Sequence, residues 1–323
     1  MREISRRALL AGTALAAGTA VLPKPAAARA PRSGAQAAGL YRYRIGEFEL
    51  TAIYDGIWDR PIDATFVRNV PFGDVQKALA DSFLPPDKLP TPFTALLVNT
   101  GGKLVLLDTG SAGQITASAG TLLANLAAAG IDPIAIDVIA ISHFHPDHIN
   151  GIKTKDDAVV FPNAEILVPT PEWDFWMDEA KLGSAREAVK NNFLNVRRIF
   201  GNIAKDVRRF EPGTEIAPGV TSIPAPGHTP GHSAFAVASG SDSMLVLSDT
   251  SFHPALFVKN PEWQCGFDMD GGLAVETRKK LLDRAAADRM LVQAYHFPFP
   301  ACGHIRRERN GYDFVPALWQ PAL

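Results

Sequence analysis

Three histidines and one aspartate lie within six residues of this chain, from His143 to His148. The segment reads His-Phe-His-Pro-Asp-His and directly follows a short apolar run, 136–141, which predicts a buried strand. Alternate side chains at an extended strand end point the same way, so two imidazoles face one side before the chain turns into a helix. Imidazole and carboxylate ligands together suit zinc and its neighbours in the first transition series. The cluster therefore predicts a metal site at the end of this strand.

Other candidate ligands also lie near the ends of predicted strands. His228 occupies a tight Pro-Gly-His-Thr turn, and Asp249 ends an apolar strand. A buried carboxylate at a strand end needs a partner, and a metal pair is the strongest partner that this sequence offers. None of the eight histidines precedes residue 143, and the remaining ones are His232, His253, His296 and His304.

The chain as a whole predicts a mixture of strands and helices. Alternating residues over 41–54 predict a strand or hairpin bent at Gly46, and Gly101-Gly102 predicts a hairpin turn between two apolar runs. Further strands are predicted over 164–169, 219–225, 233–239, 243–249 and 290–296, and helices over 116–129, 171–181, 185–200 and 272–287. Elements in this order favour two sheets with helices outside them.

Length and charge limit the class of protein. The chain has 323 residues, of which 46% are hydrophobic, so it can bury a large core as one large domain or two small ones. A formal net charge of −2 provides no basic surface for a phosphate backbone, which argues against nucleic acid as a partner. No stretch of the sequence predicts a stable membrane span.

The first 30 residues have the pattern of a twin-arginine export signal. Arg6-Arg7 precedes an Ala-rich apolar run over 8–22, and Ala28-Arg29-Ala30 fits a small-x-small cleavage site. We therefore expect cleavage after residue 30, a mature domain over 31–323, and a periplasmic or secreted location.

The sequence leaves the state of its two cysteines open. The chain has two cysteines, Cys265 and Cys302, which is an even number. The compartment beyond the inner membrane would permit a disulfide between them. Their distance in the fold decides between a bridge and two buried thiols.

Five stretches give the chain a resemblance to a known family. They read, in order, FTALLVNTGGKLVLLDTG, SHFHPDH, PGHTPGH, LSDT and AYHFPFPACGHIRRERNGYDFVP. The chain resembles the metallo-β-lactamase superfamily and, within it, the methyl parathion hydrolase group and its lactonase relatives. The last stretch is the most specific to this subgroup. The resemblance implies an α/β fold, namely an αββα sandwich with the site at one edge of the two sheets, and it implies a homodimer.

The resemblance also implies ligands for two divalent metal ions, zinc in the first place. The first metal would be bound by His143, His145 and His228, and the second by Asp147, His148 and His296, with Asp249 bridging both. Two such metals can hold a bridging hydroxide and stabilise the developing oxyanion, with Asp147 and Asp249 as the carboxylates at the reaction. Asp108 matches a carboxylate that orients site residues without binding metal.

The activity implied by the resemblance is hydrolysis of a small-molecule lactone, aryl ester or phosphotriester. Phe93, Trp176 and Phe193 lie in segments expected to supply an aromatic wall above the metals. The alternative for these three residues is ordinary core, because aromatic side chains at helical spacing usually pack inward.

Two other functions stay open. An iron-dependent redox member of the same superfamily, of the persulfide dioxygenase type, would use similar ligands, because ligand type alone does not exclude iron. A periplasmic metal-binding protein without turnover would need a closed metal shell with no open position. The roles of His232, His253 and His304 are open as well.

Replacing Arg6-Arg7 by Lys-Lys is expected to leave the precursor inside the cell, because the twin-arginine route reads that pair. Immunoblots of cytoplasmic and periplasmic fractions measure the outcome. Arg2→Lys is the matched control, since it changes an arginine outside the pair. Normal export of the double variant would point to another route.

Overall fold

The computed structural model describes residues 33, 34 and 36–323, so the predicted export signal lies outside the described residues. The chain divides into two units, Met1–Ala37 and Ala38–Leu323. The few described residues of the first unit are exposed, and the fold below is that of the second. No helix in the described part of the chain is long and apolar enough to cross a membrane.

The first sheet of this unit has seven strands, which lie side by side in sequence order. They are β1 (Leu40–Ile45), β2 (Phe48–Pro61), β3 (Lys88–Asn99), β4 (Leu104–Leu107), β5 (Val138–Ala140), β6 (Glu165–Pro169) and β7 (Val207–Phe210). Strands β1 to β4 are antiparallel, and β4 to β7 are parallel. Gly46, with a φ of 54°, forms the turn between β1 and β2, as its position in the sequence predicts.

The second sheet also has seven strands, in the order β14-β13-β12-β11-β10-β9-β8. They are β8 (Glu215–Ala217), β9 (Val220–Pro224), β10 (Ser233–Ser239), β11 (Asp242–Ser248), β12 (Leu291–Ala294), β13 (Cys302–Glu308) and β14 (Gly311–Pro316). Neighbouring strands are antiparallel except β11 and β12, which are parallel.

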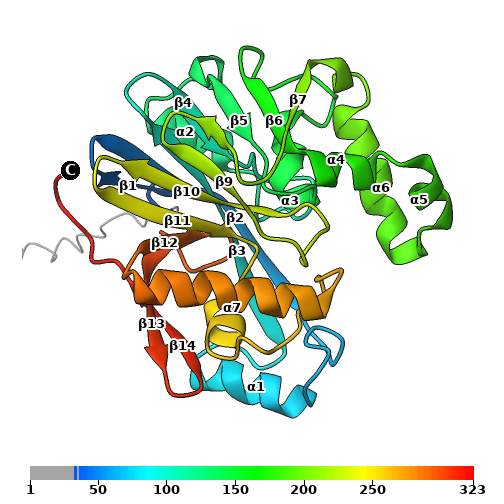
Figure 1. The fold of residues 1–323 in the computed structure, drawn as a ribbon, viewed down its shortest axis with the longest axis vertical. Helices are drawn as coiled ribbons and strands as arrows, with labels where there is room; N and C mark the ends of the chain where they lie inside the picture. Colours follow the sequence, from blue (N-terminus) through cyan, green and yellow to red (C-terminus); the bar gives the residue numbers. More distant parts are fainter. Residues whose placement is uncertain (1–32, 35) are drawn as a thin grey trace, which may run out of the picture. The chain divides into compact units, whose positions relative to one another are not determined.

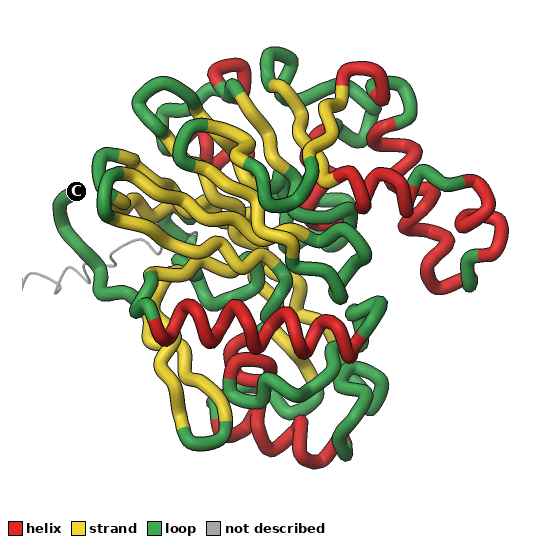
Figure 2. Tube along the Cα trace, viewed as in Figure 1, coloured by secondary structure: helices red, strands yellow, loops and turns green. Residues whose placement is uncertain are grey.

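The two sheets pack face to face, with helices on their outer faces (Figure 1; Figure 2). Leu50 and Val98 of the first sheet share one buried cluster with Phe235 and Val246 of the second. The outer faces are covered by α2 (Leu122–Ala128), α4 (Thr170–Trp176) and α6 (Glu187–Phe200) on the first sheet, and by α7 (Gly271–Ala287) on the second. Helix α5 (Glu179–Ser184) lies beside α4 and α6, away from the strands (Figure 1). The predicted αββα sandwich is therefore confirmed.

Two short helices complete the unit near the site. Helix α1 (Phe72–Asp81) packs on a π-helical turn over Pro254–Val258 through an apolar cluster that includes Val75 and Phe257. Helix α3 (Pro146–Ile149) begins within the histidine cluster, and its proline lies at the first helical position, where no amide hydrogen is needed.

The helix predicted over 116–129 begins only at Leu122. The preceding residues form a loop, because the amides of Gly120 and Thr121 donate to the Asp55 carbonyl instead of continuing a helix. The Asp55 carboxylate then accepts from the Leu122 amide at 3.1 Å. Hydrogen bonds to a distant strand therefore override the helical preference of this Ala-rich stretch.

Each sheet brings parallel strand ends to the site. In the first sheet, Asp108 directly follows β4 and His143 lies just after β5. In the second sheet, Asp249 directly follows β11 and His296 lies just after β12. Parallel strands end at the same edge of a sheet, and this is where α/β proteins place their ligand sites.

Both cysteines are free and buried, in different apolar clusters. Burial raises the pKa of the Cys302 thiol to about 11 and raises that of Cys265 still further above its usual range.

We expect no disulfide and no reactive thiolate in the native protein. A thiol reagent should detect two thiols only after unfolding in guanidinium without reductant. An unfolded protein with no reactive thiol would show that a bridge had formed.

Candidate metal centre

Seven side chains from both sheets converge in two groups of ligand atoms. The first group is His143, His145, His228 and Asp249, and the second is Asp147, His148 and His296. Within each group, the ligand atoms all lie within 4.8 Å of one another. These are the seven residues that the sequence singled out.

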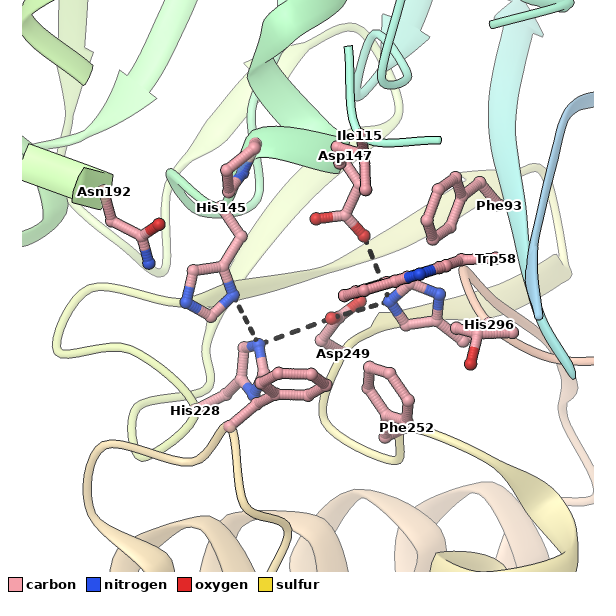
Figure 3. A pocket seen from close by; sticks show the side chains of 13 residues that line it. Trp58, Phe93, Ile115, His145, Asp147, Asn192, His228, Asp249, Phe252 and His296 are labelled. Atoms are coloured by element: carbon pink, nitrogen blue, oxygen red, sulfur yellow. Dashed lines mark hydrogen bonds and ion pairs between the residues drawn. The ribbon is translucent and has the colours of Figure 1, made fainter. Parts of the chain in front are cut away.

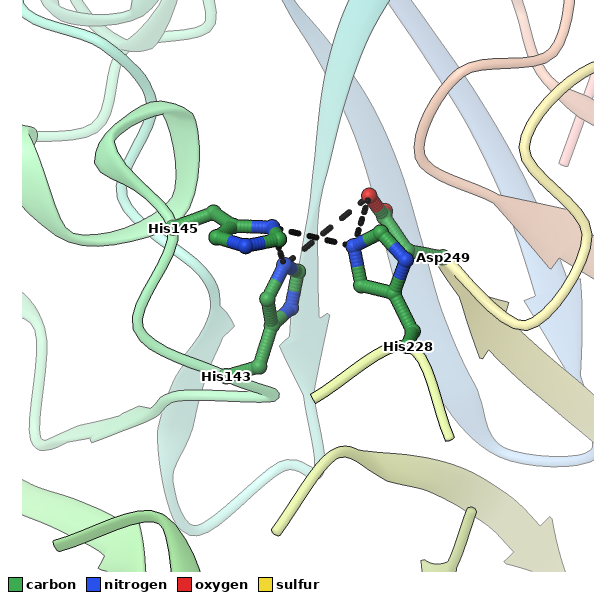
Figure 4. Close-up of side chains that lie close together, drawn as sticks. All are labelled: His143, His145, His228 and Asp249. Atoms are coloured by element: carbon green, nitrogen blue, oxygen red, sulfur yellow. Dashed lines mark hydrogen bonds and ion pairs between the residues drawn. The ribbon is translucent and has the colours of Figure 1, made fainter. Parts of the chain in front are cut away.

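The first group joins the histidine cluster to two segments of the second sheet (Figure 4). Nδ1 of His145 lies 3.0 Å from Nε2 of His143 and 3.0 Å from Nε2 of His228. Oδ2 of Asp249 is 3.3 Å from Nε2 of His228 and 3.9 Å from Nε2 of His143. Ligands about 2.0–2.1 Å from a tetrahedral zinc ion lie roughly 3.3 Å from one another, so most of these spacings suit one such ion.

The second group lies beside the first around Asp147 (Figure 3). Oδ2 of Asp147 is 3.5 Å from Nε2 of His148 and 3.4 Å from Nε2 of His296. Asp249 reaches both of these histidines as well, with Oδ1 3.3 Å from His148 and Oδ2 3.0 Å from His296. Asp249 thus touches ligands of both groups, a geometry compatible with one carboxylate shared by two ions.

Three of the histidines are oriented by acceptors behind them. In a neutral ring held this way, Nδ1 donates its hydrogen outward and Nε2 presents its lone pair to the site. The acceptors are Asp108 Oδ2 for His148 at 2.8 Å, Asp268 Oδ1 for His228 at 3.0 Å, and the Pro92 carbonyl for His296 at 2.8 Å. Lone pairs and carboxylate oxygens therefore face one another in the centre, an arrangement that a cation stabilises.

Two buried atoms of the site have no hydrogen-bond partner in the described part of the chain, namely Nε2 of His148 and Oδ1 of Asp249. They lie 3.3 Å apart without forming a hydrogen bond. An unpaired buried polar atom costs about 1–3 kcal/mol, and a metal between these two atoms would satisfy both. The donor set and these two orphaned atoms therefore fit a pair of divalent metal ions.

The pKa values of the site follow from burial and from the carboxylates. Burial lowers the pKa of His145 to about 3. Burial also disfavours the charged form of His228, but its hydrogen bonds to Asp249 and Asp268 outweigh burial and raise the pKa to about 9. For His148, too, the carboxylates outweigh burial, Asp249 first, and hold the pKa well above its usual value. The carboxylates thus attract positive charge to the centre.

The residues whose roles the sequence left open lie outside the two ligand groups. His232 is buried, donates from Nδ1 to the Ala225 carbonyl and accepts the Asp249 amide at Nε2, so it supports the backbone of a candidate ligand. His253 caps the π-helical turn by accepting the Ala255 amide. His304 is exposed on β13.

The structure separates the three residues expected in an aromatic wall. Phe93 lines a cavity of about 210 Å³ above the ligands. Trp176 and Phe193 do not line it, since both are fully buried in the core beneath α4 and α6. The Trp176 ring packs behind His145, with ring centroids 6.5 Å apart. Helical spacing here reports core packing, the alternative that the sequence left open.

Other aromatic residues line this cavity, from segments that no motif marked. They are Trp58 on β2, Phe252 after β11 and Phe267 before α7, and the polar Asn192 of α6 joins them. Arg60 stacks on the rings of Trp58 and Phe267, at 4.8 and 4.4 Å from their centroids. Only the fold brings these distant segments together. Sequence reasoning also missed Asp268 and Glu172, which have no motif around them.

Asp249→Ala and His296→Ala are each expected to weaken zinc binding by at least about a hundredfold, more than the loss of a partner behind a ligand costs. Zinc content after dialysis against a chelator measures this. His304→Ala is the control, because it removes an exposed histidine away from the ligands. A His296→Ala protein that keeps two zinc ions would remove this residue from the ligand set.

Comparison with known families and sequences supports this geometry. Residues 90–296 match the family described as the metallo-beta-lactamase superfamily, and this span contains all seven candidate ligands. A probable metallo-hydrolase of Mycobacterium tuberculosis is 30% identical over 180 residues, 49% of this chain and 56% of that protein. The N-acyl homoserine lactonase AttM of Azorhizobium caulinodans is 28% identical over 134 residues, 39% of this chain and 45% of the lactonase. The chain thus spans about half the length of these curated relatives.

Solved structures match over a larger share. AidC, a dizinc quorum-quenching lactonase solved in complex with a product, has a TM-score of 0.82 at 27% identity and covers 88% of this chain and 99% of its own. The hydrolase AbOPH has a TM-score of 0.82 at 29% identity and covers 88% of this chain and 100% of its own. The narrower methyl parathion hydrolase grouping stays a prediction. Because the family match covers more than half of the sequence and the fold agrees, the chain belongs to the metallo-β-lactamase superfamily.

Proposed function

We propose that this protein is a dinuclear zinc hydrolase that opens lactones, with aryl esters and phosphotriesters as further substrates. The observation that carries the proposal is the position of the two ligand groups, at the floor of an aromatic cavity. The dizinc lactonase AidC, whose fold this chain shares, gives independent support.

The cavity favours a neutral substrate with an apolar arm (Figure 3). Apart from candidate ligands, its lining is mainly aromatic and aliphatic, and the described residues of the lining include no lysine or arginine. An anionic substrate would find no positive charge there besides the metals. Asn192 and Thr91 are the polar residues of the lining that are not candidate ligands. The carbonyl group of an ester or lactone would therefore bind at the ligands, with the apolar arm of the substrate against the aromatic wall.

The candidate ligands and Tyr295 would have different roles in the reaction. Two bound metal ions would lower the pKa of a shared water molecule and polarise the substrate carbonyl or phosphoryl oxygen. Asp249 and Asp147 belong to the two ligand groups and line the cavity, and with the metals bound they would be the carboxylates to accept a proton from the attacking water and return it to the leaving oxygen. Tyr295 is already engaged, because its hydroxyl donates to the Asp147 carbonyl at 2.6 Å. It holds the backbone of a ligand in place.

Two further expectations complete the proposal. Export by the twin-arginine route would deliver the folded protein to the periplasm or beyond the cell. The mature protein would be a homodimer, which light scattering on the purified protein tests.

A substrate panel on zinc-loaded protein tests the function. We expect hydrolysis of N-hexanoyl homoserine lactone above that of a phosphomonoester, and we expect Asp249→Ala to lose at least about a hundredfold in kcat/KM. Iron with oxygen consumption would instead identify a redox enzyme. Bound metal without turnover on any lactone, ester or phosphotriester would support a binding protein.

Trp58→Ala and Phe267→Ala are expected to reduce kcat/KM for N-hexanoyl homoserine lactone at least tenfold more than for γ-butyrolactone. The reason is lost contact with the acyl chain, which is worth roughly 1 to 3 kcal/mol of discrimination in an apolar pocket. Phe83→Ala is the matched control, since this phenylalanine is 98% exposed and does not line the cavity. Equal losses on both substrates would mean that these rings do not select the acyl chain.

A further inference from the structure

A buried carboxylate behind the metal centre connects two ligand segments. Glu172, in the first turn of α4, is fully buried and pairs with no lysine, arginine or histidine of the described chain. Its two oxygens accept four hydrogen bonds. Oε1 accepts from the Phe144 amide at 3.0 Å and from Nε1 of Trp176 at 2.7 Å, and Oε2 accepts from the Thr229 hydroxyl at 2.9 Å and the Gly231 amide at 2.8 Å.

Three of the four donors, Phe144, Thr229 and Gly231, lie in the segments that carry three ligands of the first group. Phe144 lies between His143 and His145, and Thr229 directly follows His228. These three histidines come from two sheets, and their ligand atoms meet at 3.0 Å. Apart from Glu172, a hydrogen bond from the Ser233 amide to the Ser142 carbonyl joins the same two segments.

The packing around Glu172 fits the same purpose. A Cβ atom at Gly231 would clash with the backbone of Glu172, so this glycine allows the turn after His228 to approach α4. Trp176 covers the carboxylate from the side of the core and is itself fully buried. Water is thus kept from a group that would otherwise be solvated.

We propose that Glu172 is a positioning residue that sets the spacing of His143, His145 and His228, and thereby the affinity for the first metal ion. It touches neither the cavity nor the ligand atoms. The inference rests on the metal centre of the proposed function, but it does not depend on the substrate.

Three N–H donors require a carboxylate at this position, because two face Oε1 and one faces Oε2, so both oxygens must accept. A glutamine would turn its NH2 group toward at least one of these N–H donors, losing at least one hydrogen bond and placing two donors against each other. The Glu172→Gln substitution should therefore move one ligand segment relative to the other, while the volume of the side chain stays nearly constant.

The test uses Zn²⁺ binding by Glu172→Gln and the wild-type protein. We expect affinity for one of the two Zn²⁺ ions to fall about 10- to 100-fold, the range for losing a partner behind metal ligands, while the other ion stays as tightly bound. Stepwise competition with a chelator, followed by zinc analysis, should leave one ion in the variant where the wild type holds two. A wild-type protein that binds no Zn²⁺ would overturn the metal centre and this inference together.

Two further variants keep the test decisive. Thr229→Val removes one of the four donors without a change of volume and should weaken the same Zn²⁺ ion, though less, even where Glu172→Gln does not fold. Glu165→Gln is the matched control, because this exposed carboxylate pairs with Arg208 at 3.1 Å, away from the candidate ligands, and should leave both ions in place. Two Zn²⁺ ions at wild-type affinity in Glu172→Gln and Thr229→Val would overturn the proposal. So would a parallel loss of both ions that follows a lower melting temperature.

Discussion

The structure depends on an electrostatic requirement at the meeting point of its two sheets. Imidazole lone pairs and two carboxylates are held about 3.0 to 3.9 Å apart in a largely buried site at the floor of the cavity. Without positive charge among them, such groups repel one another and lack hydrogen-bond partners, as Asp249 Oδ1 and His148 Nε2 do. The fold forces these groups together, and bound cations would offset the cost. Metal binding would then be linked to folding, because the ions would favour the folded chain over the unfolded one.

The ligands are held close together by rigid strand ends and by a set of buried groups behind the ligands. Parallel strand pairs in each sheet end at the site, so short loops carry the ligands with little freedom. Behind them, Asp108 and Asp268 orient two imidazoles, and His232 supports the Asp249 amide. Asp268 is itself held by the buried Arg278 at 3.2 Å. Glu172 differs from these buried groups, because it joins two ligand segments and does not orient a single imidazole.

The cavity above the ligands has two chemically different parts. Its floor is polar and belongs to the candidate ligands, whereas its walls are aromatic and come from four places in the chain, at Trp58, Phe93, Phe252 and Phe267. The guanidinium of Arg60 stacks between Trp58 and Phe267 and limits their movement. In the proposed function, the walls would select a substrate by its apolar arm and neutral charge, while the candidate ligands at the floor would determine which bond is broken.

Local sequence predicted two sheets with outer helices and a metal site at the His-Phe-His-Pro-Asp-His segment, because these patterns are encoded over a few adjacent residues. It misjudged residues 116–121, where the amides of Gly120 and Thr121 bond to Asp55. The family resemblance added the αββα sandwich and the complete set of candidate ligands, but it placed Trp176 and Phe193 in the substrate wall, although they are core. Glu172 and Trp58 had no local signal, since each acts through contacts with segments more than 25 residues away. The residue types of the histidine cluster and their order follow from neighbours in the chain. The shape of the pocket and the groups that hold the ligands apart depend on how two sheets and their outer helices pack.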